Sequence, residues 1–163
     1  MSRVWKPSVT VAAVVERDGR FLLVEEHADG GLRINQPAGH LERGESLLQA
    51  VAREALEETA HPFDPTALLG IYLWRSASPA RAATYLRFAF TGELGERIAG
   101  RPLDRGIVRT LWLSREELAQ RDAQHRSPLV ARCIDDYLRG QRYPLGLLYA
   151  HPDALAPGGA ESE

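Results

Sequence analysis

The stretch GHLERGESLLQAVAREALEET, residues 39–59, decides the fold of this chain. Ser46 is a preferred helix N-cap residue, and Gln49 follows three positions later, which is the spacing of a capping box. Pro62 lacks the backbone N–H that a helix interior needs. The sequence therefore predicts a helix that begins at Leu47 and ends before Pro62.

One face of this predicted helix carries the side chains that should pack on the rest of the molecule. At about 100° per residue, that face consists of Leu48, Val51, Ala52, Ala55 and Thr59. Because the side chain of Ala55 is only a methyl group, we expect the helix to approach a sheet closely at that point.

Three glutamates, Glu54, Glu57 and Glu58, follow one another at i, i+3 and i+4 near the end of the same helix. Like charges at these spacings destabilise a helix by a few tenths of a kcal/mol, and the helix dipole disfavours carboxylates near the C-terminus. Arg53 offers an i,i+4 partner to Glu57 alone. Converging carboxylate oxygens suit a hard cation such as Mg²⁺ or Mn²⁺, whose charge offsets the repulsion. The triplet alone leaves open a second interpretation, a solvated acidic face.

The residues before the glutamates extend the triplet into a longer pattern. Five residues separate Gly39 from Glu45, seven more precede Arg53-Glu54, and two precede the last glutamate pair. This spacing resembles the Nudix box, the signature of hydrolases that cleave diphosphate linkages. The resemblance implies an α/β/α sandwich with a mixed β-sheet, in which the box forms a loop, helix, loop unit beside the sheet.

The resemblance also implies roles for the matching residues. The glutamates at 54, 57 and 58 are expected to bind Mg²⁺, for which Mn²⁺ can substitute, and one of them is expected to orient or deprotonate the attacking water. The backbone carbonyl of Gly39 is expected to reach a metal, where a side chain would block close approach. Arg53 and Glu45 are expected to support each other and to fix the glutamate rotamers.

A further acidic ligand commonly comes from outside the box in this family. Asp104 lies just before a predicted strand and is placed like that ligand. An aspartate in this position is also an ordinary turn residue, and the sequence leaves the two interpretations open.

The end of the box departs from the family's pattern. The family has a bulky aliphatic residue at the position of Ala55, a glycine at that of Ala60 and an aliphatic residue at that of His61. A left-handed Ala60 would cost about 1 kcal/mol more than glycine. The helix is therefore expected to end either with a left-handed Ala60 or earlier, in a tighter turn before Pro62.

Apolar and β-branched runs predict the strands. Residues 9–16 and 20–26 flank Asp18-Gly19, a strong hairpin signal, and are expected to pair with each other. Three later runs predict further strands at 68–74, 83–94 and 106–113. Residues 27–45 between the hairpin and the helix are predicted to form a long loop that binds something.

Two shorter helices are predicted near the end of the fold. Ser114 and Glu117 form a second capping box, and residues 127–140 predict a helix that ends at Gly140. We expect one Nudix hydrolase domain over residues 1–150, followed by a disordered tail over residues 151–163.

The composition is that of an ordinary globular protein. The chain has 163 residues, of which 44% are hydrophobic and 26% charged, and its formal net charge is -2. No net field attracts nucleic acid, and the apolar run at 9–15 is too short to span a membrane. The single cysteine, Cys133, fits a reducing cytoplasm. A monomer is slightly favoured, and the oligomeric state stays open.

Substrate selectivity is expected to come from outside the box. Arginines can bind phosphates through two hydrogen bonds, and aromatic rings can stack on a base. The candidate substrate-binding residues are Arg33, Asn35, Gln36, Trp74, Tyr85 and Arg87. For Trp74 and Tyr85, simple packing in the core is the alternative.

The resemblance extends over residues 4–149 and narrows to one branch of phosphatases within the family. It implies Mg-dependent hydrolysis of nucleoside tri- and diphosphates, or of pyrophosphorylated thiamine-pathway compounds, with release of orthophosphate. A pyrophosphatase for ADP-ribose or another dinucleotide or sugar nucleotide is the first alternative. A non-catalytic nucleotide-binding module is the second, and the presence of all five charged box residues argues against it. In each case the expected partner is a small phosphate anhydride.

Overall fold

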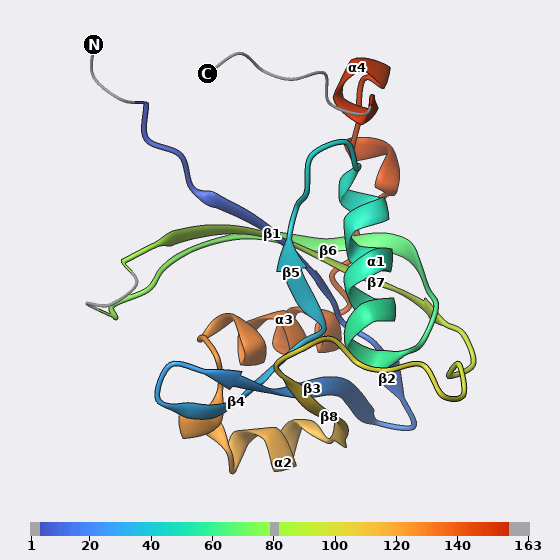
Figure 1. The fold of residues 1–163 in the computed structure, drawn as a ribbon. Coiled ribbons are helices and arrows are strands. Elements are labelled where there is room, and N and C mark those ends of the chain that lie inside the picture. The colour runs from blue at the N-terminus through green and yellow to red at the C-terminus, as the bar shows by residue number, and fades with distance from the viewer. Residues whose placement is uncertain (1–3, 79–81, 157–163) are drawn as a thin grey trace.

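The computed structural model describes residues 4–78 and 82–156, which form two four-stranded sheets with helices packed around them (Figure 1). The first sheet has the strand order β5 (Ala38–His40), β1 (Ser8–Ala13), β7 (Thr84–Leu94) and β6 (Phe63–Arg75). In the second sheet, β3 (Arg20–Ala28) pairs with β2 (Glu16–Arg17), β4 (Gly31–Asn35) and β8 (Ile107–Leu113). Because β1 and β7 are parallel and the other pairs antiparallel, the first sheet is mixed, and the predicted α/β/α sandwich is confirmed.

Strand β1 is buried on both faces of the first sheet. Val11 and Ala13 belong to the core under α1 (Leu47–Thr59), whereas Ala12 and Val14 belong to the core under α3 (Leu129–Leu138). Successive side chains of a strand point to opposite faces, so a strand covered on both sides has to be apolar at every position. This requirement explains the continuous apolar run at residues 9–15.

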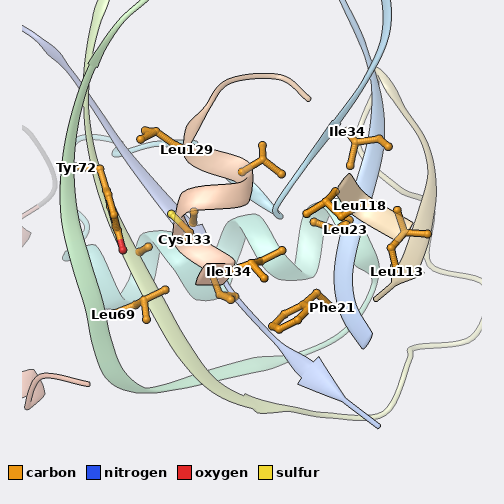
Figure 2. Close-up of a cluster of buried hydrophobic side chains, with 14 residues drawn as sticks. Phe21, Leu23, Ile34, Leu69, Tyr72, Leu113, Leu118, Leu129, Cys133 and Ile134 are labelled. Carbon is orange, nitrogen blue, oxygen red and sulfur yellow. The ribbon is translucent and has the colours of Figure 1, made fainter. Parts of the chain in front are cut away.

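The core under α3 joins the two sheets. Figure 2 shows Cys133 and Ile134 of α3 between Tyr72 of β6 and Phe21 of β3. Cys133 is fully buried, and the ring of Phe21 makes an edge contact with Tyr137 at a centroid distance of 5.4 Å. One helix therefore holds both sheets in a fixed arrangement.

Helix α1 begins at the predicted residue and carries the predicted capping box. The Ser46 side chain accepts a hydrogen bond from the backbone N–H of Gln49, and the Gln49 side chain caps Ser46 in return. The helix ends with Ala60 in the left-handed conformation, at φ 61°, where its N–H donates to the carbonyl of Leu56. Burial of the Ala60 methyl group offsets part of the roughly 1 to 2 kcal/mol that this conformation costs.

The packed face of α1 differs in part from the predicted one. Val51, Ala55 and Thr59 are buried, as predicted, and Ala55 lies against the sheet. Leu48 is partly buried and packs against the same core, whereas Ala52 is only partly buried and is not part of that core. Two glutamates are buried instead, because the second half of α1 faces the polar backbone of β5.

The predicted hairpin exists but joins different strands. Asp18 and Gly19 both have positive φ, 52° and 75°, and link β2 to β3. The prediction that residues 9–16 pair with residues 20–26 was wrong beyond Glu16, because β1 pairs with β5 and β7 in the other sheet. A local turn signal could not reveal this separation.

The predicted loop over residues 27–45 contains two strands. Strand β4 continues β3 as a hairpin through Gly30 and Gly31, both with positive φ, and β5 pairs with β1. The expectation of a loop was therefore wrong for residues 27–28, 31–35 and 38–40, and β5 brings the start of the Nudix-like box onto the edge of the first sheet.

The remaining helices follow the second sheet. Helix α2 (Arg115–Ala119) has the predicted capping box of Ser114 and Glu117, and α3 ends just before Gly140, whose φ is positive. Three short helical segments complete the description: η2 (Asp122–Gln124), η3 (Leu145–Leu147) and α4 (Pro152–Leu155). Of the predicted tail, residues 151–156 include α4, and residues 157–163 lie outside the described residues. No helix of the described residues is long and apolar enough to cross a membrane.

A buried aspartate connects α3 to β6. The Tyr72 hydroxyl donates to Asp136 Oδ2 over 2.8 Å, and Arg132 Nε donates to the same oxygen over 3.0 Å. Burial raises the pKa of Asp136, but hydrogen bonds from Arg139, Arg132 and Tyr72 outweigh burial and place this pKa below its ordinary value. The ionised aspartate therefore fixes the height of α3 over the sheet.

We predict that Asp136→Ala lowers the free energy of unfolding by about 1 to 3 kcal/mol, because it leaves the buried Tyr72 hydroxyl without its acceptor. The control is Asp135→Ala, which removes a half-exposed ion pair with Arg115 and should cost less than about 1 kcal/mol. Urea denaturation measures both. Equal costs for the two variants would contradict the prediction.

Candidate active site

Arg53 is the centre of the polar network on α1. Its Nε and Nη2 atoms donate to the two oxygens of Glu45 over 2.9 and 2.7 Å, a bidentate pair. Its Nη1 atom donates to Glu54 over 2.8 Å and to Glu57 over 3.1 Å, and Nη2 also reaches the backbone carbonyl of His40. The hydrogen bonds from Arg53 lower the pKa of Glu45. Arg53 therefore holds two of the predicted ligands and the loop before the helix together.

Glu54 lies directly against the backbone of Gly39. A Cβ atom on Gly39 would overlap the carboxylate group of Glu54, so no larger residue fits at this position without moving the glutamate. Burial raises the pKa of Glu54, hydrogen bonding to Arg53 lowers it, and the charges of Glu57 and Asp104 raise it further, with an upward net shift. The close approach of the Glu54 carboxylate to the backbone explains why position 39 is a glycine.

Glu58 is buried, and its burial shifts its pKa more than burial shifts that of Glu54. Its Oε2 atom accepts a hydrogen bond from the backbone N–H of Ala38 over 3.0 Å. Burial raises its pKa to about 9, and the nearby charges of Glu26, Glu54 and Asp104 add to the rise. Without a cation, the folded protein therefore keeps Glu58 protonated at neutral pH.

The structure brings Asp104 to the same cluster. The backbone N–H of Asp104 donates to the carbonyl of Glu57 over 2.9 Å, which attaches the loop before β8 to the last turn of α1. Its carboxylate is close enough for its charge to raise the pKa of both Glu54 and Glu58. Four carboxylates from two segments thus lie close enough, at the C-terminal half of α1, for their charges to interact.

The chemistry of this donor set fits a hard divalent cation. All the candidate ligands are oxygen atoms, from carboxylates and from the Gly39 backbone, and Mg²⁺ and Mn²⁺ prefer such ligands. Among residues 4–78 and 82–156, no three acidic, histidine or cysteine side chains are already arranged as a set of metal ligands. Glu54 and Glu57 instead accept hydrogen bonds from Arg53, whose positive charge lies between them.

A cavity of about 370 Å³ opens next to Gly39. Five of the six predicted substrate-binding residues line it: Arg33, Asn35, Trp74, Tyr85 and Arg87. The rings of Trp74 and Tyr85 are stacked, with centroids 5.7 Å apart and an interplanar angle of 18°. The aromatic residues therefore form part of the cavity wall, and Trp74 also packs against the core under α3.

The sixth residue, Gln36, lies behind the cavity wall. It is buried, and its side-chain oxygen accepts a hydrogen bond from Arg87 Nη1 over 3.1 Å. Arg87 Nη2 donates to the side-chain oxygen of Asn35 over 3.3 Å. Gln36 therefore contacts a cavity residue and does not itself line the cavity.

Seven polar residues of the cavity wall were missed from the sequence: Thr10, Glu26, Asp29, Ser76, Ser78, Arg126 and Ser127. Glu26 accepts a hydrogen bond from Asn35 over 3.3 Å and lies 3.6 Å from Arg126 Nε, and burial raises its pKa. Glu26 could have been predicted as a site residue, because it is an acidic residue at the end of the apolar run over residues 20–26. No local pattern distinguishes Arg126 from the other arginines, because its place depends on how the segment before α3 docks on β4.

A model of the NUDIX domain family matches residues 5–133. The chain belongs to the Nudix hydrolase family. It is 43% identical over 145 residues to the Phosphatase NudJ of Escherichia coli strain K12, and the match covers 89% of this chain and 92% of that protein. A solved NUDIX hydrolase from Nitrosomonas europaea is 52% identical, with a TM-score of 0.86 and coverage of 90% of this chain and 99% of the other.

More distant Nudix structures share the fold alone. The NUDIX domain of NrtR from Shewanella oneidensis, solved with ADP ribose, is 20% identical with a TM-score of 0.64, and the match covers 84% of this chain and 90% of that one. Within this Nudix hydrolase, the carboxylate cluster and the cavity meet at Gly39, whose backbone contacts Glu54 and lines the cavity.

The pKa of Glu58 predicts how the stability of the metal-free protein depends on pH. Between its ordinary value of 4.5 and the folded value of about 9, the unfolded chain has lost a proton that the folded protein retains. The stability of the metal-free protein should therefore fall as pH rises through this window. Glu58→Gln removes this titration, so its free energy of unfolding at pH 8 should exceed that of the natural protein by about 1 kcal/mol or more.

Urea denaturation at pH 5 and pH 8, with a chelator present, measures this difference. Glutamine keeps an oxygen that can accept from Ala38, so the variant retains the contact with β5. The same loss of stability with pH in both proteins would show that Glu58 is already ionised in the folded state.

Proposed function

We propose that this Nudix hydrolase is a Mg²⁺-dependent phosphatase. Its substrates are nucleoside tri- and diphosphates or pyrophosphorylated thiamine-pathway compounds, from which it releases orthophosphate. The observation that carries the proposal is the position of four converging carboxylates beside a cavity with arginine and aromatic walls. The 43% identity to a Phosphatase NudJ over most of both chains supports the same reaction class.

The residues of α1 have distinct parts in this proposal. Glu54, Glu57 and Glu58, with Asp104 and the Gly39 carbonyl, hold Mg²⁺ or Mn²⁺. Such a cation, when bound, neutralises the diphosphate oxygens and acidifies a water molecule. One of the three glutamates takes the proton from the attacking water. A bound cation would compete with Arg53 Nη1, the donor that Glu54 and Glu57 share, for these two carboxylates.

Arg53 and Glu45 have a supporting part. Their bidentate contact, over 2.7 and 2.9 Å, fixes the guanidinium independently of the two shared glutamates. When those glutamates bind a cation, Arg53 keeps its bonds to Glu45 and to the His40 carbonyl. The helix and the loop before it therefore hold their arrangement in both states.

The cavity supplies recognition. The stacked pair Trp74 and Tyr85 offers a flat apolar surface for a base or pyrimidine ring, Arg33 offers positive charge for phosphate oxygens, and Arg87 offers further donors to the substrate. Arg33 follows the Gly30-Gly31 turn of the β3–β4 hairpin, and its guanidinium lies close to Gly30. In the proposal, this turn and Arg33 orient the terminal phosphate.

Two alternatives are tested by the same experiments. A pyrophosphatase for ADP-ribose or another dinucleotide or sugar nucleotide would use the same carboxylates with a different leaving group. A nucleotide-binding module without turnover is disfavoured, because the charged box residues are all present and Arg53 connects Glu45, Glu54 and Glu57. A reducing cytoplasm is the proposed location, supported by the single, buried Cys133.

We predict that hydrolysis requires a divalent cation and depends on Glu57. Activity should be absent with excess chelator and return with Mg²⁺ or Mn²⁺. Glu57→Gln should lower kcat by about 10²-fold or more, as the loss of one electrostatic contribution to a transition state typically does. The control is Glu116→Gln, which changes an exposed glutamate of α2.

Turnover assays with thermal unfolding of each variant separate loss of chemistry from loss of fold. Full activity in chelator would refute the metal requirement. A loss of less than about tenfold in Glu57→Gln would mean that this residue is not a primary ligand.

The product distinguishes the proposed phosphatase from the pyrophosphatase alternative. With GDP and Mg²⁺, we expect GMP and orthophosphate, and we expect ADP-ribose to be a poor substrate. Phosphorus NMR of the reaction mixtures identifies the products, and the same reaction in H₂¹⁸O shows which phosphorus is attacked. Efficient cleavage of ADP-ribose to AMP and ribose phosphate, with GDP intact, would favour the alternative.

A further inference from the structure

We infer that Gln36 is a positioning residue that fixes Arg87 for substrate recognition and links this arginine to the carboxylate cluster through residues 35–39, here called the bridge segment. This inference rests on the proposed function and deepens it. In this arrangement Arg87 donates to an oxygen or nitrogen acceptor on the part of the substrate beyond the scissile diphosphate. Gln36 itself does not touch the substrate.

The side chain of Gln36 has one available orientation. It is 1% exposed, its Nε2 atom donates to the carbonyl of Val130 over 2.7 Å, and its oxygen accepts from Arg87 Nη1 over 3.1 Å. A flipped amide would place an N–H against the Arg87 donor and an oxygen against a carbonyl. The first turn of α3 therefore sets the amide, and the amide sets the guanidinium.

Arg87 has no ion pair within 4.0 Å among the described residues. Its side-chain hydrogen bonds go to the neutral amides of Gln36 and Asn35. The acidic group nearest in effect is Glu26, which interacts with the charge of Arg87 but is itself bonded to Asn35 and lies 3.6 Å from Arg126. Arg87 is 7% exposed and lines the cavity. A substrate atom in the cavity therefore supplies the direct acceptor that Glu26 does not.

The register of the first sheet shows where that atom would lie. Tyr85 and Arg87 are two residues apart on β7, so they share the cavity face and are separated by roughly 6 to 7 Å along the strand. Tyr85 is paired with Trp74 on the neighbouring strand β6, and Arg87 is paired with Thr10 on the other neighbour, β1. A ring stacked on the aromatic pair would therefore present its edge to the next row of the sheet, where the guanidinium lies.

The bridge segment connects this row to the carboxylates. At its start, Asn35 and Gln36 hold Arg87, and at its end the Ala38 N–H donates to Glu58 while Gly39 lies against Glu54. The carbonyl in its middle, at residue 37, accepts from β1 over 2.9 Å. Because residue 37 is a bend between β4 and β5, the segment spans less than the roughly 13 Å of four extended steps. Its bonds at both ends fix where a substrate held by Arg87 lies relative to the carboxylates.

The test is a double-mutant cycle on GDP hydrolysis with Mg²⁺. Gln36→Met should raise KM about tenfold and change kcat less than about threefold, because it removes positioning without removing a ligand of the reacting atoms. Arg87→Met should raise KM at least as much. In the double variant, KM should equal that of Arg87→Met, because Gln36 acts only through Arg87.

Gln141→Met is the matched control. Gln141 also donates its Nε2 atom to a backbone carbonyl, that of Leu69, over 2.9 Å, but it is not part of the cavity wall. This variant should lower Tm and leave KM unchanged. Additive effects of Gln36→Met and Arg87→Met on KM, or an unchanged KM in Gln36→Met, would overturn the inference.

A second variant covers the case in which Gln36→Met does not fold. Arg87→Lys keeps a positive charge but cannot bond both amides, because an ammonium lacks the planar fork of a guanidinium. KM should rise about tenfold at a similar kcat. An unchanged KM in Arg87→Lys would show that the orientation set by Gln36 has no part in recognition.

GMP titration by calorimetry, without metal, separates this inference from the proposed function. Weaker GMP binding in Gln36→Met than in Gln141→Met supports the inference even if GDP is not hydrolysed, and equal binding contradicts it. A natural protein that neither hydrolyses GDP nor binds GMP would refute the proposed nucleotide substrate, and with it the role assigned to Arg87.

Discussion

The contact between β5 and the second half of α1 is the interaction on which the rest of the site depends. The backbone N–H of Ala38 bonds to Glu58, and the absence of a side chain at Gly39 lets Glu54 lie against the strand. Because β5 is also paired with β1, the carboxylates are attached to a strand that is buried on both faces. The position of the acidic cluster is therefore as rigid as the core, although the cluster lies at a sheet edge.

Clustering four carboxylates costs free energy, and Arg53 offsets part of it. Burial and mutual repulsion raise the pKa of Glu54 and Glu58, which is the response expected of acids that lack a cation. Arg53 supplies one positive charge to Glu54 and Glu57 while its other side is held by Glu45. A lysine could not make these bonds together, because its ammonium has no planar fork of donors. The arginine thus keeps the ligands close together in the metal-free protein.

The sequence was informative where structure is decided locally. The capping box, the start of α1 and the glutamate spacing depend on residues within a few positions of one another, and all are found in the structure. The partners of β1, the strands β4 and β5, and the contribution of Glu26 and Arg126 to the cavity depend on contacts between distant segments. The ending of α1 was left open between two solutions, because the burial that offsets the strain of Ala60 is a tertiary effect. The Nudix resemblance supplied the sandwich, which no periodicity in the chain specifies.

In the proposed function, recognition and chemistry use different elements, which meet at the bridge segment and at Glu26 of β3, a cavity residue whose charge raises the pKa of Glu58. The carboxylates of the cluster come from α1 and the loop before β8, whereas most of the cavity wall comes from β3, β4, β6, β7 and the segment before α3. Substitutions at Trp74 or Tyr85 can therefore change the shape of the cavity without moving Glu54 or Glu58, provided that the bridge segment keeps its bonds to β1 and Glu58. This separation gives a physical reason why one set of carboxylates can serve different phosphate anhydrides. It also places the strictest structural requirement on residues 35–39, which must satisfy the arginine at one end and the glutamates at the other.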